Sequence, residues 1–351
     1  MSQADAASGM VDTSPILSIC IPTYNRAAFL PALLDSILSE INGLTQGLSG
    51  KDVEIVISDN NSTDDTDRVV ASYQELLPRL VFLKQTENIG ADRNYIAAIA
   101  ASSGTFSWLM GSDDRVEAGG VAHVLSCAQR FQDAAGFTIG VKGYDSRFEA
   151  EIAIADSVNL NTATLIEGAE EAYAVFIEQF GFISAQIVRR ELWQATCETH
   201  DFTPYLNAYV HLFIIGKMLQ DRPCWGYTPQ VCVGWRSGND SFLQDGWLKR
   251  MNLDVVGYGN ATAGVFGKDS LVSKKVRNRI AGSHIYRHYI FAKSHDASSE
   301  SLKQAARIIY MNYIDTKAYW TKLFPLIVTP APVLRLARHV YRQIRYLAGR
   351  R

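Results

Sequence analysis

Short apolar runs alternate with amphipathic segments between residues 16 and 110. The apolar runs have the length of β-strands and lie at residues 16–21, 53–57, 80–83 and 106–110. Apolar residues spaced three or four positions apart predict helices at 29–38 and 66–77, and an alanine-rich segment predicts a third at 95–101. Strands that alternate with helices in this way predict an α/β fold built on parallel strands.

Polar residues follow each predicted strand at the point where it ends. These segments are Pro22-Thr-Tyr-Asn-Arg26, Ser58-Asp-Asn-Asn-Ser-Thr-Asp-Asp65, Asn88-Ile-Gly-Ala-Asp-Arg-Asn94 and Gly111-Ser-Asp-Asp114. The carboxyl ends of parallel strands meet at one edge of a sheet, and open α/β sheets bind ligands at that edge. We therefore expect the four segments to form one binding site.

Aspartates in these segments are the main candidates for ligand contacts. Asp113 is a predicted ligand of Mg²⁺ or Mn²⁺, because a cation that bridges a diphosphate prefers hard oxygen ligands. Taken alone, Asp113 and Asp114 are better explained as a helix cap, but the upstream pattern favours the metal site. Asp59 is predicted to accept an N–H group of a pyrimidine base. Local chemistry supports a turn or helix cap at residues 60–66 equally well.

The segment after the first strand is a candidate phosphate-binding loop. It contains Thr23, Tyr24, Asn25 and Arg26 at the start of a predicted helix. Free backbone N–H groups and a cation suit a diphosphate there, and the tyrosine ring can cover a base or ribose. Arg93 is a second candidate phosphate contact. For either arginine the alternative is an ordinary surface charge.

In order and spacing, these motifs resemble the family 2 glycosyltransferases of the GT-A fold. The resemblance covers residues 14–125 clearly and continues loosely to about 242. It implies a Rossmann-like mixed sheet and an enzyme of the hexosyltransferase type, which moves a sugar from a nucleotide-diphosphate donor to an acceptor hydroxyl, with inversion as the family default. It also places Asn88 and Gly90 in the donor site. The residues of these motifs most resemble those of abequosyltransferase-type enzymes of bacterial O-antigen (lipopolysaccharide) synthesis. This resemblance implies a CDP-dideoxyhexose donor.

The chain departs from the family pattern at three places. The family motif Leu-Asp-x-Asp-Asp has Gly111 in place of its first aspartate, and the Glu-Asp pair that supplies the general base aligns with Val210-His211. His211 is chemically suited to act as base near neutral pH, although a single histidine on an amphipathic helix is more often structural. Asp114 is the competing candidate for the base. A later Tyr-Arg-x-His element lacks its histidine, and Arg236 remains as a candidate pyrophosphate contact.

These departures leave a second function open, a catalytically impaired GT-A-like module that binds nucleotide sugars. Other classes are disfavoured. No GxxxxGK[ST] or GxGxxG motif follows a predicted strand, which argues against NTPases and dinucleotide-binding enzymes. A nucleotidyltransferase would also need a glycine-rich phosphate loop where this chain has Pro22-Thr-Tyr-Asn-Arg26.

Charge divides the 351 residues into two regions. Residues 1–250 carry 17 Lys/Arg and 31 Asp/Glu, a net charge of −14, whereas residues 251–351 carry 17 and 5, a net charge of +12. We therefore expect a glycosyltransferase domain at 14–250 and a basic helical appendage at 251–351. Residues 1–13 are expected to be a disordered tail without the pattern of a signal peptide. Five cysteines without CxxC spacing are typical of reduced cytoplasmic thiols.

The last segment of the chain predicts a basic amphipathic helix that begins near Val333. Its arginines form one stripe at 335, 338, 342 and 345, and its apolar residues form another at 333, 336, 340, 344 and 347. Such a helix can lie on an anionic membrane surface, and the alternative is a helix packed on the domain with a solvated basic face. No apolar run is long enough to span a membrane. Nucleic acid is not an expected partner, because the rest of the chain is acidic.

The resemblance completes this hypothesis with an acceptor. It implies a glycan linked to polyprenyl diphosphate, extended by a peripheral enzyme at the cytoplasmic face of the cell membrane.

Overall fold

The computed structural model describes residues 14–348 apart from 46, 155–157, 159, 240–245 and 296. The predicted tail, residues 1–13, lies outside the described residues. Contacts divide the chain into two compact units: unit 1 consists of Met1–Lys142, Ser184–Gln194 and Thr228–Trp235, and unit 2 of Gly143–Ile183, Ala195–Tyr227 and Arg236–Arg351. Residue 250, where the charge composition changes, lies inside helix α8 (Trp247–Phe266). The change of charge therefore does not coincide with the end of an element.

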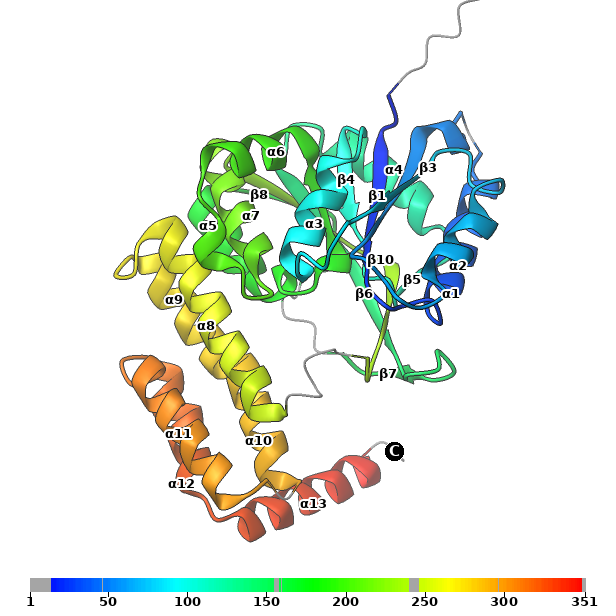
Figure 1. Ribbon diagram of the computed structural model, residues 1–351. Helices are drawn as coiled ribbons and strands as arrows, with labels where there is room; N and C mark the ends of the chain where they lie inside the picture. Colours follow the sequence, from blue (N-terminus) through cyan, green and yellow to red (C-terminus); the bar gives the residue numbers. More distant parts are fainter. Residues whose placement is uncertain are drawn as a thin grey trace, which may run out of the picture. The chain divides into compact units, whose positions relative to one another are not determined.

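A mixed sheet forms the centre of unit 1 (Figure 1). Its strands are β1 (Leu17–Thr23), β2 (Val53–Asp59), β3 (Leu80–Lys84), β4 (Phe106–Leu109), β5 (Arg115–Val116) and β9 (Gln186–Arg189), and β6 (Gly136–Tyr144) and β10 (Cys224–Arg236) run from this unit into the other. The strand order is β3-β2-β1-β4-β9-β6-β10-β5. β3, β2, β1 and β4 are parallel, whereas β9 is antiparallel to β4 and β6, and β5 is antiparallel to β10. The four predicted strands and the α/β class are confirmed.

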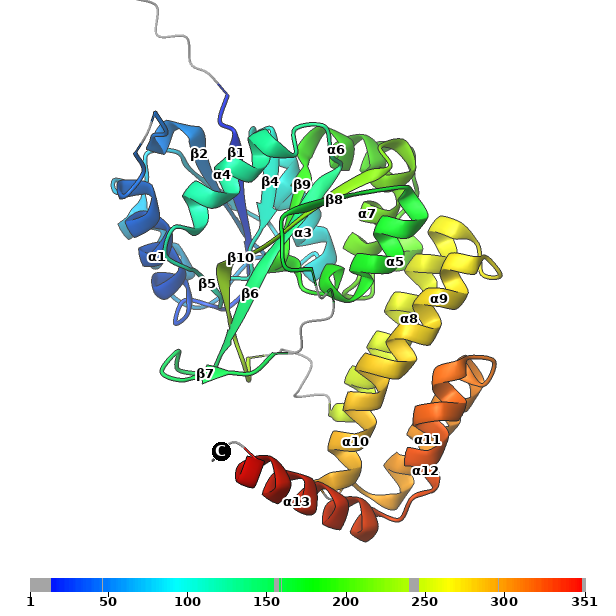
Figure 2. The same cartoon turned by 180° about the vertical axis from the view of Figure 1, so that it is seen from behind.

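Helices cover both faces of this sheet. Those of unit 1 are α1 (Leu30–Asn42), α2 (Thr66–Tyr73), α3 (Ala91–Ala100) and α4 (Gly120–Arg130), with short turns η1 (Gly50–Asp52) and η2 (Ile183–Ala185); α6 (Arg190–Thr199) begins here. α3 packs against β1 and β2, and α4 lies on the opposite face, seen in front in Figure 2. α1 buries an apolar stripe of Leu30, Leu33, Leu34, Ile37 and Ile41, as its periodicity predicts.

Unit 2 is mainly helical. Its helices are α5 (Ala169–Phe180), α7 (Val210–Asp221), α8, α9 (Leu271–Ile280), α10 (Tyr286–Ser294), α11 (Ser299–Tyr313), α12 (Phe324–Val328) and α13 (Ala331–Ala348), with a 3₁₀ turn η3 (Thr203–Tyr205), π turns η5 (Ala281–Ile285) and η6 (Tyr319–Leu323), and strands β7 (Glu151–Ile152) and β8 (Thr164–Glu167). The predicted helical C-terminal region is thus confirmed. α7 packs closely on α8 because Gly216 has no side chain: a Cβ there would lie 2.6 Å from Cγ2 of Val265.

Within the described part of the chain, no helix is both long and apolar enough to span a bilayer.

Candidate active site

The carboxyl ends of the parallel strands bring the predicted site segments of unit 1 together. In the strand register Thr23 lies opposite Asp59, and Asp59 lies opposite Lys84. β4 is paired so that Leu109 lies opposite Cys20, and the Met110 N–H donates to the Cys20 carbonyl at 2.9 Å. All four segments therefore leave the sheet at one edge, as the sequence predicts.

Hydrogen bonds tie the loop after β1 to the loop after β2. The Asn25 side-chain oxygen accepts the Thr63 N–H at 2.8 Å, and the Asn25 N–H donates to the Ser62 hydroxyl at 2.8 Å. The Ala27 N–H donates to Asp64 at 2.9 Å. Asn25 has φ +52°, in the left-handed region that asparagine tolerates better than most residues. In this structure Asn25 therefore fixes the shape of the candidate phosphate loop.

Asp59 lies fully buried at the end of β2 and closes the turn that follows. Its carboxylate accepts the Ser62 N–H at 3.1 Å and also the Ser62 hydroxyl. The turn role that local chemistry allowed is therefore present. A carboxylate has about four acceptor sites, so these two bonds leave chemical capacity for a base N–H.

Amide side chains join the ends of β1, β2 and β3. Asn60 donates to Asn88 at 2.9 Å, and the Gly90 N–H donates to the same Asn88 oxygen at 2.9 Å. The buried Asn94 donates to the Ser58 carbonyl at 2.9 Å and accepts the Ser58 hydroxyl at 2.7 Å. Gly90, with φ +85°, precedes α3, so the predicted helix begins four residues earlier, at Ala91, than the alanine-rich run suggested. This network fixes the loops from which a donor would be bound.

Three candidate side chains differ in exposure at this edge. Tyr24 is 43% exposed, so its ring is accessible to a ligand. Arg93 is exposed in the first turn of α3. Thr23 is buried, and its hydroxyl has no hydrogen-bond partner among the described residues.

Gly111 to Asp114 form a turn directly after β4. The Asp114 N–H donates to the Gly111 carbonyl at 3.2 Å. Asp114 is buried, and its Oδ2 accepts the hydroxyl of Ser184. The side chain of Asp113 is 24% exposed, and its Oδ2 lies 3.7 Å from Nη1 of Arg26. Arg26 also lies over the Phe29 ring, 5.3 Å from its centroid.

The local electrostatics of this edge are dominated by aspartates. The pKa of the Tyr95 hydroxyl is raised, first by burial and then by the charges of Asp92, Asp113 and Asp114, whereas Arg26 opposes the shift. Tyr95 thus reports on a cluster of negative charge around the Gly111 turn. A diphosphate at this edge would meet both these carboxylates and the guanidinium of Arg26.

The donor set at the turn suits a hard divalent cation. Carboxylate oxygens of Asp113 and Asp114 are the type of ligand that Mg²⁺ and Mn²⁺ prefer. Among the described residues no group of three or more His, Cys, Asp or Glu side chains is arranged to hold a metal. A cation here would thus have few protein ligands and would depend on phosphate oxygens for the rest.

His211 lies in unit 2, on α7, and is enclosed by the protein. The residue is only 1% exposed, and its Nε2 lies 2.9 Å from the Phe180 carbonyl oxygen. Because a carbonyl only accepts, Nε2 carries the proton. Nδ1 has no partner among the described residues. Burial lowers the pKa of His211 to about 4. An enclosed imidazole cannot reach an acceptor hydroxyl in this conformation, which weakens its assignment as base.

Arg236 also belongs to unit 2, at the end of β10. Its guanidinium lies over the Phe148 ring, 4.2 Å from the centroid, and donates to the Ser146 carbonyl at 3.2 Å. Its predicted contact with pyrophosphate stays a prediction.

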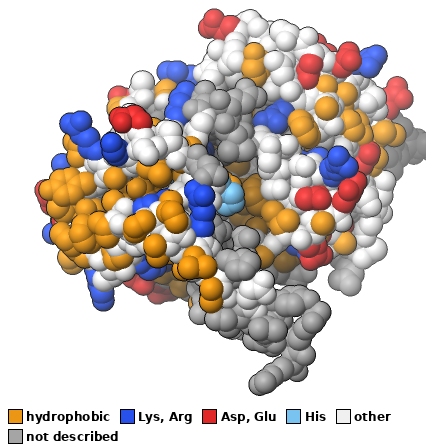
Figure 3. Space-filling view, turned by 90° about the horizontal axis from the view of Figure 1, so that it is seen from below, with side chains coloured by type: hydrophobic (Ala, Val, Ile, Leu, Met, Phe, Trp, Pro, Cys, Tyr) orange, Lys and Arg blue, Asp and Glu red, His pale blue; other side chains and the backbone are white. Residues whose placement is uncertain are grey.

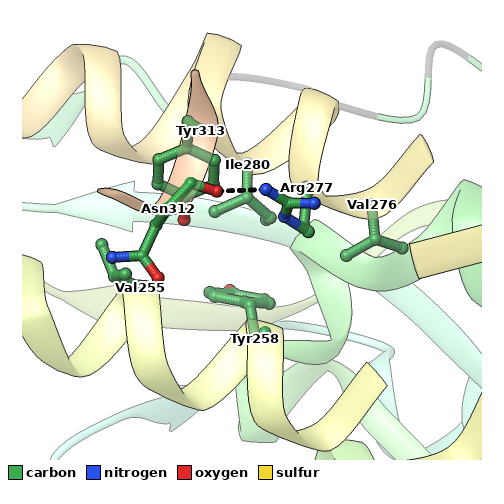
Figure 4. A pocket seen from close by; sticks show the side chains of 8 residues that line it. Val255, Tyr258, Val276, Arg277, Ile280, Asn312 and Tyr313 are labelled. Carbon is green, nitrogen blue, oxygen red and sulfur yellow. Dashed lines mark hydrogen bonds between the residues drawn. The ribbon is translucent and has the colours of Figure 1, made fainter. Parts of the chain in front are cut away.

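A small pocket in unit 2 lies between α8, α9 and α11 (Figure 4). Val255, Tyr258, Val276 and Ile280 supply most of its apolar lining, and Arg277 donates to the Asn312 carbonyl at its border. None of the predicted donor-site residues lines this pocket.

Two contributors to the site were missed in the sequence, Ser62 and Ser184. Both are serines whose hydroxyls bind an aspartate. Ser184 lies about 70 residues beyond Asp114 in the chain, so no local pattern connects the two.

The chain is similar to known glycosyltransferases. Residues 18–192 match the family model "Glycosyl transferase family 2". The abequosyltransferase RfbV of Salmonella typhimurium is 26% identical over 276 residues, which cover 75% of this chain and 79% of that protein. The GalNAc(5)-diNAcBac-PP-undecaprenol beta-1,3-glucosyltransferase of Campylobacter jejuni is 33% identical over 115 residues, which cover 32% of this chain and 35% of that protein.

Solved structures share the fold. S. aureus TarS in complex with UDP-GlcNAc has a TM-score of 0.60 at 15% identity, and the match covers 93% of this chain and 91% of that chain. The mannosyltransferase PcManGT from Pyrobaculum calidifontis, in complex with GDP-Man and Mn²⁺, has a TM-score of 0.53 at 16% identity, with 92% and 88% covered. Together with the motifs at the sheet edge, these matches mean that the chain belongs to the family 2 glycosyltransferases and has the GT-A fold.

Proposed function

We propose that this glycosyltransferase moves a sugar from a nucleotide-diphosphate donor to a hydroxyl of a glycan during synthesis of a bacterial surface polysaccharide. One observation carries the donor site: Asp113 and Arg26 lie 3.7 Å apart at the carboxyl edge of the parallel strands. A carboxylate and a guanidinium at that edge provide one group for a cation and one for a phosphate. Asp59 and Tyr24 are the proposed contacts of the base and ribose.

The donor we propose is a CDP-dideoxyhexose. The similarity to an abequosyltransferase over three quarters of the chain supports the dideoxyhexose. The buried carboxylate of Asp59 can accept an N–H of cytosine, and it can also accept from uracil or thymine. A binding screen of UDP-, dTDP-, CDP- and GDP-sugars separates these alternatives.

A divalent cation is the proposed cofactor, with Asp113 as its protein ligand beside Asp114. When bound, it neutralises charge that develops on the leaving nucleoside diphosphate. The Mn²⁺ in the PcManGT complex supports this proposal. The protein's own part is to hold Asp113 and Arg26 at the mouth of the site and to orient the donor through Asp59.

Asp114 is our candidate for the general base. Both Asp114 and His211 are buried, but Asp114 lies in the same turn as Asp113 at the strand edge, and the pKa of His211 is lowered to about 4. A base must lie within hydrogen-bond reach of the proton it removes, so position favours Asp114. Asp114→Asn should then lower kcat about 10²- to 10⁴-fold, while His211→Gln should change kcat little. The opposite result would return the role to His211.

The acceptor we propose is a glycan linked to polyprenyl diphosphate at the inner face of the membrane. The Campylobacter relative, whose name includes a PP-undecaprenol acceptor, supports this class. The described part of α13 supports membrane contact, because Val333, Leu336 and Val340 of its apolar stripe are all exposed, Leu336 to 65%. Figure 3 shows hydrophobic side chains gathered with Lys and Arg where the C-terminal helices form this face. An exposed apolar stripe speaks against simple packing on the domain.

The donor site can be tested by calorimetry with CDP, with and without Mn²⁺. Asp113→Ala should remove the gain in affinity that Mn²⁺ provides. Asp59→Ala should weaken CDP binding about 10- to 100-fold under both conditions, since a hydrogen bond to a charged group is lost. Ser62→Ala is the matched control, because it removes the hydroxyl bond to Asp59 and keeps both the carboxylate and the backbone N–H bond of the turn. If Asp59→Ala and Ser62→Ala lowered CDP affinity equally, Asp59 would act only through the turn and would not contact the base.

The alternative function, a nucleotide-sugar-binding module, is favoured by Gly111 in place of a metal-binding aspartate. Release of nucleoside diphosphate from a bound donor separates the two functions. Donor binding without release in the presence of Mn²⁺ and membrane acceptor would contradict the enzyme proposal.

A further inference from the structure

Ser184 reaches the Gly111 turn from a distant part of the chain. It lies in η2, which precedes β9, and its side chain is fully buried. Its carbonyl accepts the indole N–H of Trp108 at 2.8 Å, so strand β4 fixes its backbone. Its hydroxyl accepts the Gly111 N–H at 2.9 Å and donates to Oδ2 of Asp114.

The directions of these bonds are determined by chemistry. A backbone N–H can only donate, so the hydroxyl hydrogen of Ser184 is left for the carboxylate of Asp114. The hydroxyl thus holds both the backbone of Gly111 and the side chain of Asp114. The one bond that reaches Asp114 comes from a hydroxyl that Gly111 also holds, and it restricts the rotamer of Asp114 inside the protein.

The space above Gly111 is filled by this pair. A Cβ added to Gly111 would lie 2.9 Å from Oδ2 of Asp114, 3.1 Å from Oγ of Ser184 and 3.3 Å from Oδ1 of Asp113. Oxygen atoms of both aspartates therefore converge on the position from which an aspartate at 111 would project. Side chains at 111 and 184 compete for one volume.

We infer that Ser184 is a positioning residue of the donor site, which holds Asp114 beside Asp113 in the place that an aspartate at position 111 would need. The ligand in this inference rests on the proposed function, whereas the contacts of Ser184 are independent of that function. Without the hydroxyl, the Asp114 carboxylate loses this hydrogen bond in a region that also holds the charges of Asp92 and Asp113. The arrangement of oxygen atoms offered to a cation then becomes less defined.

The first test measures CDP binding to the full chain by calorimetry, with and without Mn²⁺. Ser184→Ala should reduce the Mn²⁺-dependent gain in CDP affinity about 10- to 100-fold, the usual effect of removing a residue that orients a metal ligand. CDP affinity without Mn²⁺ should stay within about twofold. Ser107→Ala is the matched control, since Ser107 is also a fully buried serine of unit 1 and its hydroxyl hydrogen-bonds with that of Ser102. Equal effects of the two variants on the Mn²⁺-dependent gain would overturn the inference.

The second test is a thermal double-mutant cycle without any ligand. Gly111→Asp should lower Tm strongly in the wild type, because Asp114 and Ser184 must separate to admit the new side chain. In the Ser184→Ala background the same substitution should lower Tm clearly less, because the competing hydroxyl is gone. Losses in Tm that simply add would show that the two positions do not share one volume and would overturn the inference. If the wild type bound no CDP, the proposed donor would be contradicted. The double-mutant cycle would still test the role of Ser184, because it measures Tm without ligand.

Discussion

His211 is a titratable side chain enclosed by α7 and its neighbours. The folded protein lowers its pKa to about 4, whereas a histidine in an unfolded chain has a pKa near 6.5. Between these values the unfolded chain binds more protons than the folded protein, so stability falls as the pH is lowered through this window. Above about pH 6.5 this contribution does not change.

Thermal unfolding between pH 7.5 and 4.5 tests this linkage. We expect the wild type to lose stability across the window, with His211 accounting for on the order of 2–3 kcal/mol. His211→Gln should lose less, because glutamine can still donate to the Phe180 carbonyl but does not titrate. Parallel pH profiles for the two proteins would mean that His211 is not the group that titrates.

Asp254 joins three helical elements of unit 2. This fully buried residue of α8 accepts from Tyr209, directly before α7, and from Arg250 one turn earlier on α8. Nε2 of His288, on α10, lies 2.8 Å from its other oxygen. Burial alone would raise the pKa of Asp254, but the hydrogen bond from His288 and the charge of Arg250 lower it to about 2. The carboxylate thus stays ionised and connects α7, α8 and α10.

Removal of this carboxylate should destabilise the helical packing. We expect Asp254→Ala to cost about 3–5 kcal/mol in the free energy of unfolding, because it removes the buried acceptor shared by Tyr209, Arg250 and His288. Asp269→Ala, at an exposed position beyond the end of α8, is the control and should lie within about 0.5 kcal/mol of the wild type. Denaturant titration measures both, and similar midpoints for the two variants would argue against a structural role of the network.

At the scale of the whole molecule, the charge distribution and the exposed apolar surface both favour the proposed partner, an anionic membrane surface. Residues 1–250 carry a net charge of −14 and residues 251–351 a net charge of +12, so we expect an anionic surface to attract the C-terminal region more strongly. In that region Trp320 is 54% exposed and forms a ring contact with Phe324 at 5.5 Å. Exposed aromatic rings beside basic residues are typical of proteins that lie in a membrane interface.

Sedimentation with anionic liposomes tests this proposal. Truncation after Thr329 removes α13 and should release the protein, because each basic residue at such a surface contributes on the order of 1 kcal/mol. Leu336→Glu should weaken binding in the full chain, whereas Leu271→Glu, on the exposed surface of α9, should not. Activity on a short soluble acceptor should persist in all three variants. Equal sedimentation of the truncated and full-length proteins would contradict the membrane role of α13.

Local pattern determined much of this protein. Strands β1 to β4, the polar segments after them and the α/β class follow from hydrophobic periodicity, because each strand and its loop are contiguous in the chain. The arrival of Asp59 and Asp113 at one edge follows as well, since parallel strands have only one carboxyl edge. Helix α13 was also predicted, because a helix places residues three and four apart on one face. Of its apolar stripe the structure describes Val333, Leu336 and Val340, and the side chains at 338, 342, 344, 345 and 347 lie outside the described residues.

Tertiary structure decided the chemistry of individual side chains. Asn25 fits a ligand site in sequence, but its loop hydrogen bonds depend on Ser62 and Thr63, which lie 37 and 38 residues further along the chain. The imidazole of His211 is chemically suited to act as a base, but its environment is that of a buried core residue. Ser184 gains its role only because η2 returns to the Gly111 turn. Burial and long-range hydrogen bonds depend on contacts between distant segments, and a pattern of neighbouring residues carries no record of them.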